Sequence, residues 1–388
     1  MHKRSPFPLL ALSFLFGTMM AVSSAFAQND GSLLQQLNTI SPVSSTIPGN
    51  GDVNPYGVVK VLKTTGKLTR GHILVSNFNN SMNQQGTGTT IVDISPSGTQ
   101  TLFAQINAGS LPGECPGGVG LTTALAVLRS GWVIVGSLPT SDGTSATIQR
   151  GCLIVLDKNG NPVETFFGTL INGPWDMTWW ENGRDVKLFV SNVLNGVKNN
   201  GMVVRQGSVV RIDLTATASA MPSVNGMTVV ASGFPERTDP AALIIGPTGL
   251  ALSNPCDVED TDDCPAVANT EGAQALYVAD TLGNRIVTVS NPLFRTDSAG
   301  VGDPFSAGGS LNGPLGLTVD SFGHVFAVNS NNGFITEINP QRVQVAKKLL
   351  NSTGSPKGAG ALFGLVFDPD VNGIYFVDDD ENALNLLH

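Results

Sequence analysis

The chain has 388 residues, with 21 Lys or Arg against 30 Asp or Glu, so its formal net charge is −9. An acidic surface repels phosphate backbones, which argues against a nucleic-acid partner. Glycine (45 residues) and proline (23 residues) punctuate short runs of Val, Ile, Leu and Phe, a composition typical of all-β structure.

The first 27 residues have the pattern of a secretory signal peptide. Lys3 and Arg4 provide a positive start, residues 9–22 form an apolar run, and an Ala-Phe-Ala cleavage pattern ends at Ala27. The apolar run is shorter than the ~20 residues that cross a bilayer. We therefore expect cleavage after Ala27 and a secreted or periplasmic product without a membrane span. The mature chain, residues 28–388, loses two basic residues and keeps a net charge of −11.

A phrase recurs imperfectly six times after the signal peptide. It joins a small-residue turn and an apolar strand to a second apolar strand that ends in Asn or Asp. Its six anchor residues are Val58, Leu125, Met177, Leu250, Leu317 and Leu365. The last interval, 48 residues, has the length of a four-stranded propeller blade, about 40–50 residues. We predict an all-β, six-bladed β-propeller over residues 28–388, because radial repetition explains the phrase and a β-sandwich does not.

The end of the chain predicts how the ring closes. Only three strands fit after the last turn, at Leu362–Phe367, Gly373–Val377 and Ala383–Leu387. The segment Ile40–Ile47 is the one unassigned candidate for the missing outer strand. An N-terminal strand in the last blade removes an exposed sheet edge, so we expect this closure.

Four cysteines suit an oxidising compartment. Cys256 and Cys264 bracket a short acidic loop and are expected to pair, which leaves Cys115 with Cys152. Four cysteines allow three connectivities, so the other pairings stay open. The chain has no CxxC pair and few histidines, which disfavours a zinc site.

The repeated phrase resembles the NHL repeat of exported bacterial propellers. The resemblance rests on Val278-Ala279-Asp280-Thr281-Leu282-Gly283-Asn284-Arg285-Ile286, and on Gly313-Pro314-Leu315-Gly316-Leu317 followed by Gly323-His324-Val325-Phe326-Ala327-Val328-Asn329. It is good over residues 240–388 and degenerate over residues 50–235. It implies a propeller, most often six-bladed in the exported relatives. It implies no single function, because the repeat occurs in binding modules, lyases and sugar-lactone hydrolase-like enzymes.

One face of the predicted propeller carries a ring of oxygen-bearing side chains, where the second strands end and the first strands begin. These ring residues are Asn77, Asn192, Asp280, Asn329 and Asp378. Such a ring can hold Ca²⁺, with Asn192, Asp280, Asn329 and Asp378 as the metal-ligand candidates. In gluconolactonase-like propellers a metal in such a place activates water for attack on a lactone. The alternative is that each side chain caps its own turn, which the repeat requires with or without a ligand.

Two further features are candidate binding elements. Trp175 stands at the variable turn position on the same face, where it can stack on a sugar or an apolar ligand. The acidic loop with Asp257, Asp260 and Asp262 is a second calcium candidate, but it lacks the Gly and Glu of an EF-hand loop and also suits a solvated surface.

Signals of catalysis are scarce. His72 and His324 precede second strands, on the face opposite the ring residues, and no set of histidines converges as in propeller lyases. The chain has no GxSxG elbow, no HExxH and no phosphate loop. The leading hypothesis is an exported, monomeric binding or scaffold module for a protein or small-molecule ligand. The alternatives are a calcium-dependent hydrolase or lyase of the gluconolactonase-like propeller group and a cell-surface structural protein, and the sequence leaves open whether the protein is an enzyme.

Overall fold

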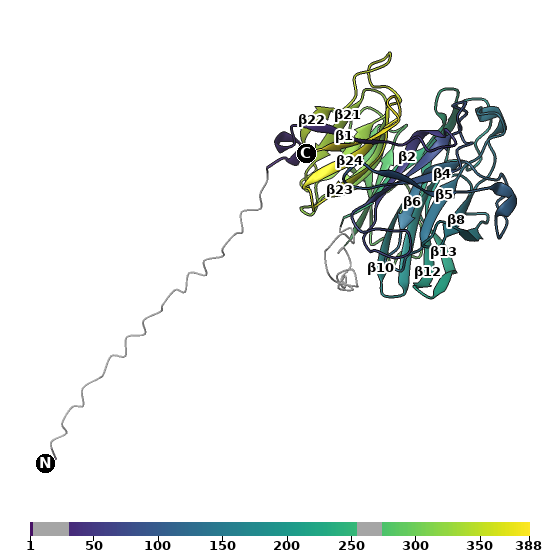
Figure 1. Ribbon diagram of the computed structural model, residues 1–388. Helices are drawn as coiled ribbons and strands as arrows, with labels where there is room; N and C mark the ends of the chain where they lie inside the picture. The colour runs from purple at the N-terminus through teal and green to yellow at the C-terminus, as the bar shows by residue number, and fades with distance from the viewer. Residues whose placement is uncertain (3–30, 254–273) are drawn as a thin grey trace. The chain divides into compact units, whose positions relative to one another are not determined.

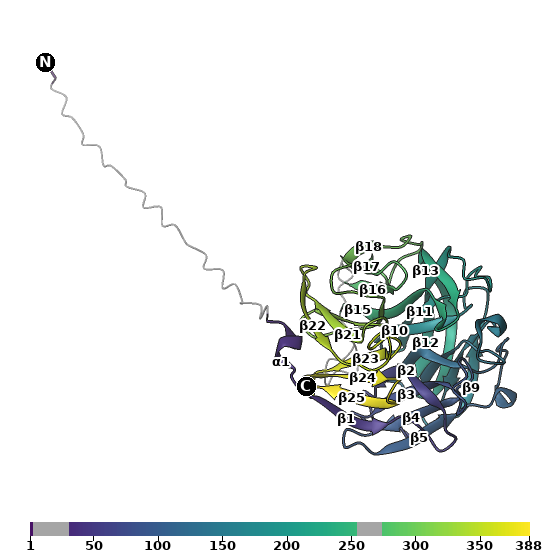
Figure 2. The same cartoon turned by 90° about the horizontal axis from the view of Figure 1, so that it is seen from above.

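The computed structural model describes residues 1–2, 31–253 and 274–388. In this part of the chain, six antiparallel sheets form a ring (Figure 1). Figure 2 shows β2, β10, β15 and β23 close to the centre, and β5, β9, β13, β18 and β22 at the periphery. The predicted six-bladed, all-β propeller is confirmed. No helix among the described residues is long and apolar enough to cross a membrane.

Each sheet begins with its innermost strand. The first two blades contain β2 (Val53–Lys60), β3 (Ile73–Asn79), β4 (Thr90–Ile94) and β5 (Gln100–Gln105), then β6 (Leu121–Val127), β7 (Val133–Ser137), β8 (Cys152–Leu156) and β9 (Pro162–Phe166). The third blade has five strands: β10 (Pro174–Asn182), β11 (Asp185–Asn192), β12 (Val204–Thr217), β13 (Ala220–Asp239) and β14 (Leu243–Ile245).

The remaining blades return to four strands. The fourth and fifth contain β15 (Pro247–Leu252), β16 (Ala275–Asp280), β17 (Arg285–Ser290) and β18 (Asp303–Ala307), then β19 (Pro314–Val319), β20 (Val325–Asn329), β21 (Phe334–Ile338) and β22 (Gln344–Leu349). The sixth combines β23 (Leu362–Asp368), β24 (Gly373–Asp378) and β25 (Ala383–Leu387) with β1 (Ile40–Ser45).

The predicted closure by an N-terminal strand is confirmed. β1 pairs antiparallel with β25, with Ile40 opposite Leu387 and Ser45 opposite Ala383. The strand ends at Ser45, two residues before the predicted limit. Because strands from both ends of the chain share one sheet, the ring has no open edge at this junction.

A buried carboxylate fastens the segment before β1 to the fifth blade. Glu337 accepts hydrogen bonds from the hydroxyl of Ser32 (2.5 Å) and from the backbone N–H groups of Leu33 and Leu34 (2.9 Å each). Its Oε1 also lies 2.6 Å from Nδ1 of His324, and both side chains are buried. The short helix α1 (Leu33–Gln36) begins at this attachment.

The hydrophobic core is divided into layers between neighbouring blades. One layer packs Val59 and Leu74 of the first blade against Leu125 and Ile154 of the second. Each layer needs only its two blades, which is how a long chain builds a core without one central mass.

One disulfide lies in the second blade. Cys115 is bonded to Cys152, with their Cα atoms 5.2 Å apart, as predicted. The other predicted pair, Cys256 and Cys264, lies outside the described residues.

Candidate functional site

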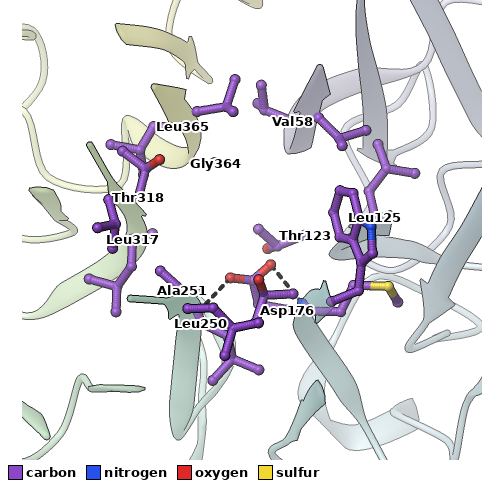
Figure 3. A pocket seen from close by; sticks show the side chains of 18 of the residues that line it. Val58, Thr123, Leu125, Asp176, Leu250, Ala251, Leu317, Thr318, Gly364 and Leu365 are labelled. Atoms are coloured by element: carbon purple, nitrogen blue, oxygen red, sulfur yellow. Dashed lines mark hydrogen bonds between the residues drawn. The ribbon is translucent and has the colours of Figure 1, made fainter. Parts of the chain in front are cut away.

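The innermost strands surround a central channel with a cavity of about 100 Å³. Figure 3 shows its mostly apolar wall, which includes Val58, Leu125, Leu250, Leu317 and Leu365. Threonines from three blades add hydroxyl groups: Thr123, Thr178 and Thr318. Asp176 and Lys60 are the ionisable residues among those that line this cavity.

Asp176 occupies a position where the other blades have glycine or alanine. The first strand of each blade pairs with the second strand of the same blade, and the pairing register shifts once along the first strand. In the third blade, for example, Pro174 lies opposite Asn192 and Met177 lies opposite Val190, and the shift falls between these two pairs. In five blades the residue just before the second pair is Ala124, Asp176, Gly249, Gly316 or Gly364. In the first blade the same position is taken by Gly57, which pairs with Ser76 and directly precedes the pair of Val58 with Val75.

Close approach of neighbouring blades explains the small residues. A Cβ on Gly249, Gly316 or Gly364 would lie 2.1 or 2.2 Å from a backbone carbonyl oxygen of the next blade. A branched polar side chain at this level is therefore a departure from the repeat that packing alone does not favour.

The carboxyl group of Asp176 points into the channel (Figure 3). One oxygen accepts from the N–H of Met177 (2.8 Å) and the other from the N–H of Leu250 in the next blade (2.9 Å). Protein atoms surround the group, although part of its surface still faces the cavity. Burial raises the pKa of Asp176 to about 7, because the two backbone donors offset only part of the desolvation. A carboxyl in this range can take up and release protons at neutral pH.

Aromatic side chains close the channel at the end where the first strands begin. We call Tyr56, Phe78, Trp175 and Phe363 the aromatic plug. The ring of Tyr56 stacks on Phe363 and on Phe78, with centroids 3.9 and 4.4 Å apart. Trp175 packs edge-on against Tyr56 at 5.6 Å and against Phe78 at 6.2 Å. Trp175, predicted to face a ligand, is 2% exposed and takes part in this packing.

The predicted ring residues are buried and bonded within their own surroundings. Asn192 accepts from the backbone N–H groups of Asn172 (3.1 Å) and Gly173 (3.4 Å). Asp280 accepts from the N–H of Gly283 (3.0 Å) and from Nε of Arg285 (2.8 Å).

Two of the other three ring residues follow the same pattern, whereas Asn77 acts as a donor and its buried Oδ1 has no hydrogen-bonding partner among the described residues. Asn329 accepts from the N–H of Asn312 (3.0 Å), and Asp378 accepts from the side-chain amide of Asn351 (2.7 Å). Asn77 donates to the carbonyl of Thr46 (3.0 Å). None of the five belongs to the lining of the channel cavity.

The residues present do not fit a calcium ion in the channel. Ca²⁺ takes roughly six to eight oxygen ligands, whereas Asp176 is the one carboxylate that lines this cavity, and both its oxygens accept backbone N–H groups. Across residues 31–253 and 274–388, no three or more His, Cys, Asp or Glu residues gather as a metal site requires. The second calcium candidate, with Asp257, Asp260 and Asp262, lies outside the described residues.

Two further ionisable side chains are buried. Glu236 on β13 does not belong to the cavity lining, and burial raises its pKa to about 8, with the N–H of Asn195 as a partial offset. Lys60, the last residue of β2, lines the cavity, and its ammonium donates to the carboxylates of Asp368 and Asp370.

Sequence reasoning missed Asp176 although a signal was present. The phrase Pro174-Trp175-Asp176-Met177 breaks the small-residue rule that Gly249, Gly316 and Gly364 obey. The aromatic plug carried no comparable signal, because its members come from three blades and meet only in the folded chain.

No protein-family model matches the chain, and no curated protein sequence matches it. Among solved structures, it is similar to regucalcin, a calcium-binding protein from Agrobacterium tumefaciens, with a TM-score of 0.52, 12% identity, and 90% and 93% of the two chains covered. It is also similar to a luciferin-regenerating enzyme, with a TM-score of 0.52, 13% identity, and 90% and 94% covered. A third similar structure is the gluconolactonase XC5397 from Xanthomonas campestris, with a TM-score of 0.50, 12% identity, and 88% and 87% covered.

At this level of identity the similarity concerns the fold. It supports a propeller without singling out the NHL repeat, which stays a resemblance of sequence. The chain therefore has the six-bladed β-propeller architecture of these three proteins, one of which carries the name of a lactone hydrolase.

Proposed function

We propose that the protein is an enzyme that hydrolyses a small, uncharged lactone or ester in its central channel, with Asp176 as the proton-transfer group. The observation that carries this proposal is the Asp176 carboxyl, held inside the channel at a position where the repeat calls for glycine. A gluconolactonase among the similar structures supports the reaction class.

Asp176 can serve both proton transfers of a hydrolysis. In its ionised form it takes a proton from a water molecule as the water oxygen bonds to the carbonyl carbon. It then returns that proton to the ester oxygen as the bond between this oxygen and the carbonyl carbon breaks. A carboxyl with a pKa near the working pH suits both steps, and such catalysis typically contributes about 10²–10⁴-fold in rate.

The lining favours an uncharged substrate. Lys60, the one cationic lining residue, is already bonded to Asp368 and Asp370. The rest of the wall offers aliphatic groups and threonine hydroxyls. Transfer of an unpaired charge into such surroundings is costly.

The test measures turnover of a panel of small lactones and esters. We expect the Asp176→Asn variant to lose at least about 100-fold in kcat/KM. The Asp378→Asn variant is the matched control, because it changes a carboxyl that lies outside the channel lining. If the native protein turns over no member of the panel, or if Asp176→Asn retains full activity, the enzyme proposal fails. A binding module then becomes the better account.

Calcium and EDTA provide a second arm. Because the channel lacks a calcium ligand set, we expect neither to change the melting temperature or the turnover. A calcium-dependent rise in melting temperature that is lost in Asp378→Asn would instead support a metal on the ring residues.

We also propose that the protein is exported, is cleaved after Ala27 and works as a monomer formed by residues 28–388. The Cys115–Cys152 disulfide supports an oxidising compartment. N-terminal sequencing of the exported protein should begin at Gln28, and sedimentation should give the mass of one chain. An uncleaved leader or a stable dimer would contradict these expectations.

A further inference from the structure

We propose that the substrate enters the channel from the face where the first strands end. Its polar group then lies next to Asp176, and its apolar part lies along the first strands between Asp176 and that face. This inference deepens the proposed function. It depends on that function only where it assigns the polar group of the ligand to Asp176, because the direction of access is a property of the fold.

The channel is closed at the end that carries the ring residues. Directly before the small-residue position, the six first strands contribute Tyr56, Thr123, Trp175, Thr248, Leu315 and Phe363. Five of these are at most 6% exposed. The stacked rings of the aromatic plug occupy their centre, and Leu243 and Ile244, each 1% exposed, pack on the same cluster. A ligand from this face would have to displace a packed apolar layer.

The opposite part of the channel keeps accessible surface. Thr178, Trp179 and Val366 follow the small-residue position along β10 and β23, and each is only half-buried. The lining continues along the strands to Lys60 and Val319. The cavity therefore runs from Asp176 toward the end of the first strands, away from the plug.

The chemistry of the wall fixes the orientation of the ligand. Asp176 lies at the deep end, next to the plug, whereas Ala251, Leu317 and Val366 offer apolar surface farther along. Burial of a polar group without a hydrogen-bonding partner is unfavourable, so the polar group of the ligand is most stable where the carboxyl of Asp176 can bond to it.

The cavity also limits the size of the ligand. One water molecule needs about 10–15 Å³ on the same measure, so about 100 Å³ holds several waters or one small organic molecule. A hydrolysis product with its own carboxylate would lose its hydration in this wall, which favours release.

A cysteine placed in the channel tests the direction of access without any need for turnover. In Thr178→Cys, the thiolate would attack methyl methanethiosulfonate, form a methyl disulfide and release methanesulfinate. The extent of labelling is read by mass spectrometry of the folded protein, with the wild type as the background for its own cysteines. We expect Thr178→Cys to react in the native state.

Second-site variants at two positions then distinguish access from the two faces. Val366→Phe, which narrows the channel beyond Asp176, should slow labelling at least tenfold, with Val366→Leu as a milder version if the larger side chain prevents folding. Phe363→Ala, which removes part of the plug, should change the rate less than twofold. The proposal is overturned if labelling occurs only after unfolding, or if Phe363→Ala accelerates it while the Val366 variants do not.

The polar-end assignment has its own readout. Small lactones such as δ-valerolactone should protect the cysteine of Thr178→Cys from labelling. When Asp176→Asn is added, the lactone concentration required for the same protection should rise at least tenfold. If the Asp176→Asn substitution leaves the protection unchanged, the proposed orientation of the ligand is refuted, while the proposed direction of access still stands. If the protein turns over no substrate but the labelling results are as expected, the proposed function is refuted. The direction of access and the orientation of the ligand would then still stand.

Discussion

The carboxyl of Asp176 makes the native state less stable as the pH rises. Burial moves its pKa from 3.8 to about 7. The unfolded chain thus releases this proton near pH 4, while the folded chain holds it to about pH 7. Between these values the folded state binds more protons than the unfolded state, so stability falls with increasing pH.

The size of the effect follows from the shift. One pKa unit corresponds to about 1.4 kcal/mol, so the full shift is worth about 4 kcal/mol of unfolding free energy between pH 4 and pH 8. Asp176→Asn removes the titration. Its amide can accept only one of the two N–H groups, from Met177 and Leu250, and this cost does not vary with pH. The unfolding free energy of Asp176→Asn minus that of the wild type should therefore rise by about 4 kcal/mol between pH 4 and pH 8.

Urea unfolding at a series of pH values measures this difference. Tryptophan fluorescence and circular dichroism should give coincident transitions, which justifies the two-state free energies. The titration of Glu236 is present in both proteins and cancels. Asp303→Asn, at an exposed carboxyl on β18, is the matched control. A difference that stays flat within about 1 kcal/mol would show that the channel carboxyl does not retain its proton, and the reasoning about Asp176 would be refuted.

Three stability predictions follow from the packing and the cross-links. Gly316→Ala should lower the unfolding free energy by at least about 3 kcal/mol or prevent folding, because the added Cβ would lie 2.1 Å from a carbonyl oxygen. Gly226→Ala is the control: its Cβ would have no atom within 3.8 Å, so the same denaturation assay should show little change. Glu337→Ala should cost about 3–5 kcal/mol and make the N-terminal segment protease-sensitive, since four donors lose their acceptor; wild-type resistance would argue against this attachment. Joint replacement of Cys115 and Cys152 by Ala should cost about 4 kcal/mol, the chain-entropy value for their separation of 37 residues, and an unchanged urea midpoint would contradict it.

The fold and the site carry different weight as arguments about function. A propeller built from radial repeats supports many chemistries, so similarity to a gluconolactonase or to regucalcin at 12% identity shows the architecture alone. Asp176 and the channel around it are therefore the features that favour an enzyme, and the tests concern those atoms.

The architecture of this protein was predictable from local features of its amino-acid sequence. Short apolar runs, turn residues and the interval between repeats are local properties of the chain, and they predicted six blades and closure by the strand at Ile40. The Cys115–Cys152 pair followed from the expected pairing of the other two cysteines across a short loop. Strand periodicity and turn chemistry depend on neighbours in the sequence, which is why these features were readable.

The surroundings of the candidate site residues could be seen only in the folded chain. In the sequence, the ring residue Asn192 suits either a metal ligand or a turn cap, and its hydrogen bonds to backbone N–H groups became visible only in the folded chain. Asp176 gains its pKa from burial and from the N–H of Leu250, 74 residues away. The plug that separates one channel end from the other joins side chains from three blades. Desolvation and packing depend on groups that are distant in the sequence, so neither the protonation of Asp176 nor the closed end of the channel could be predicted without the fold.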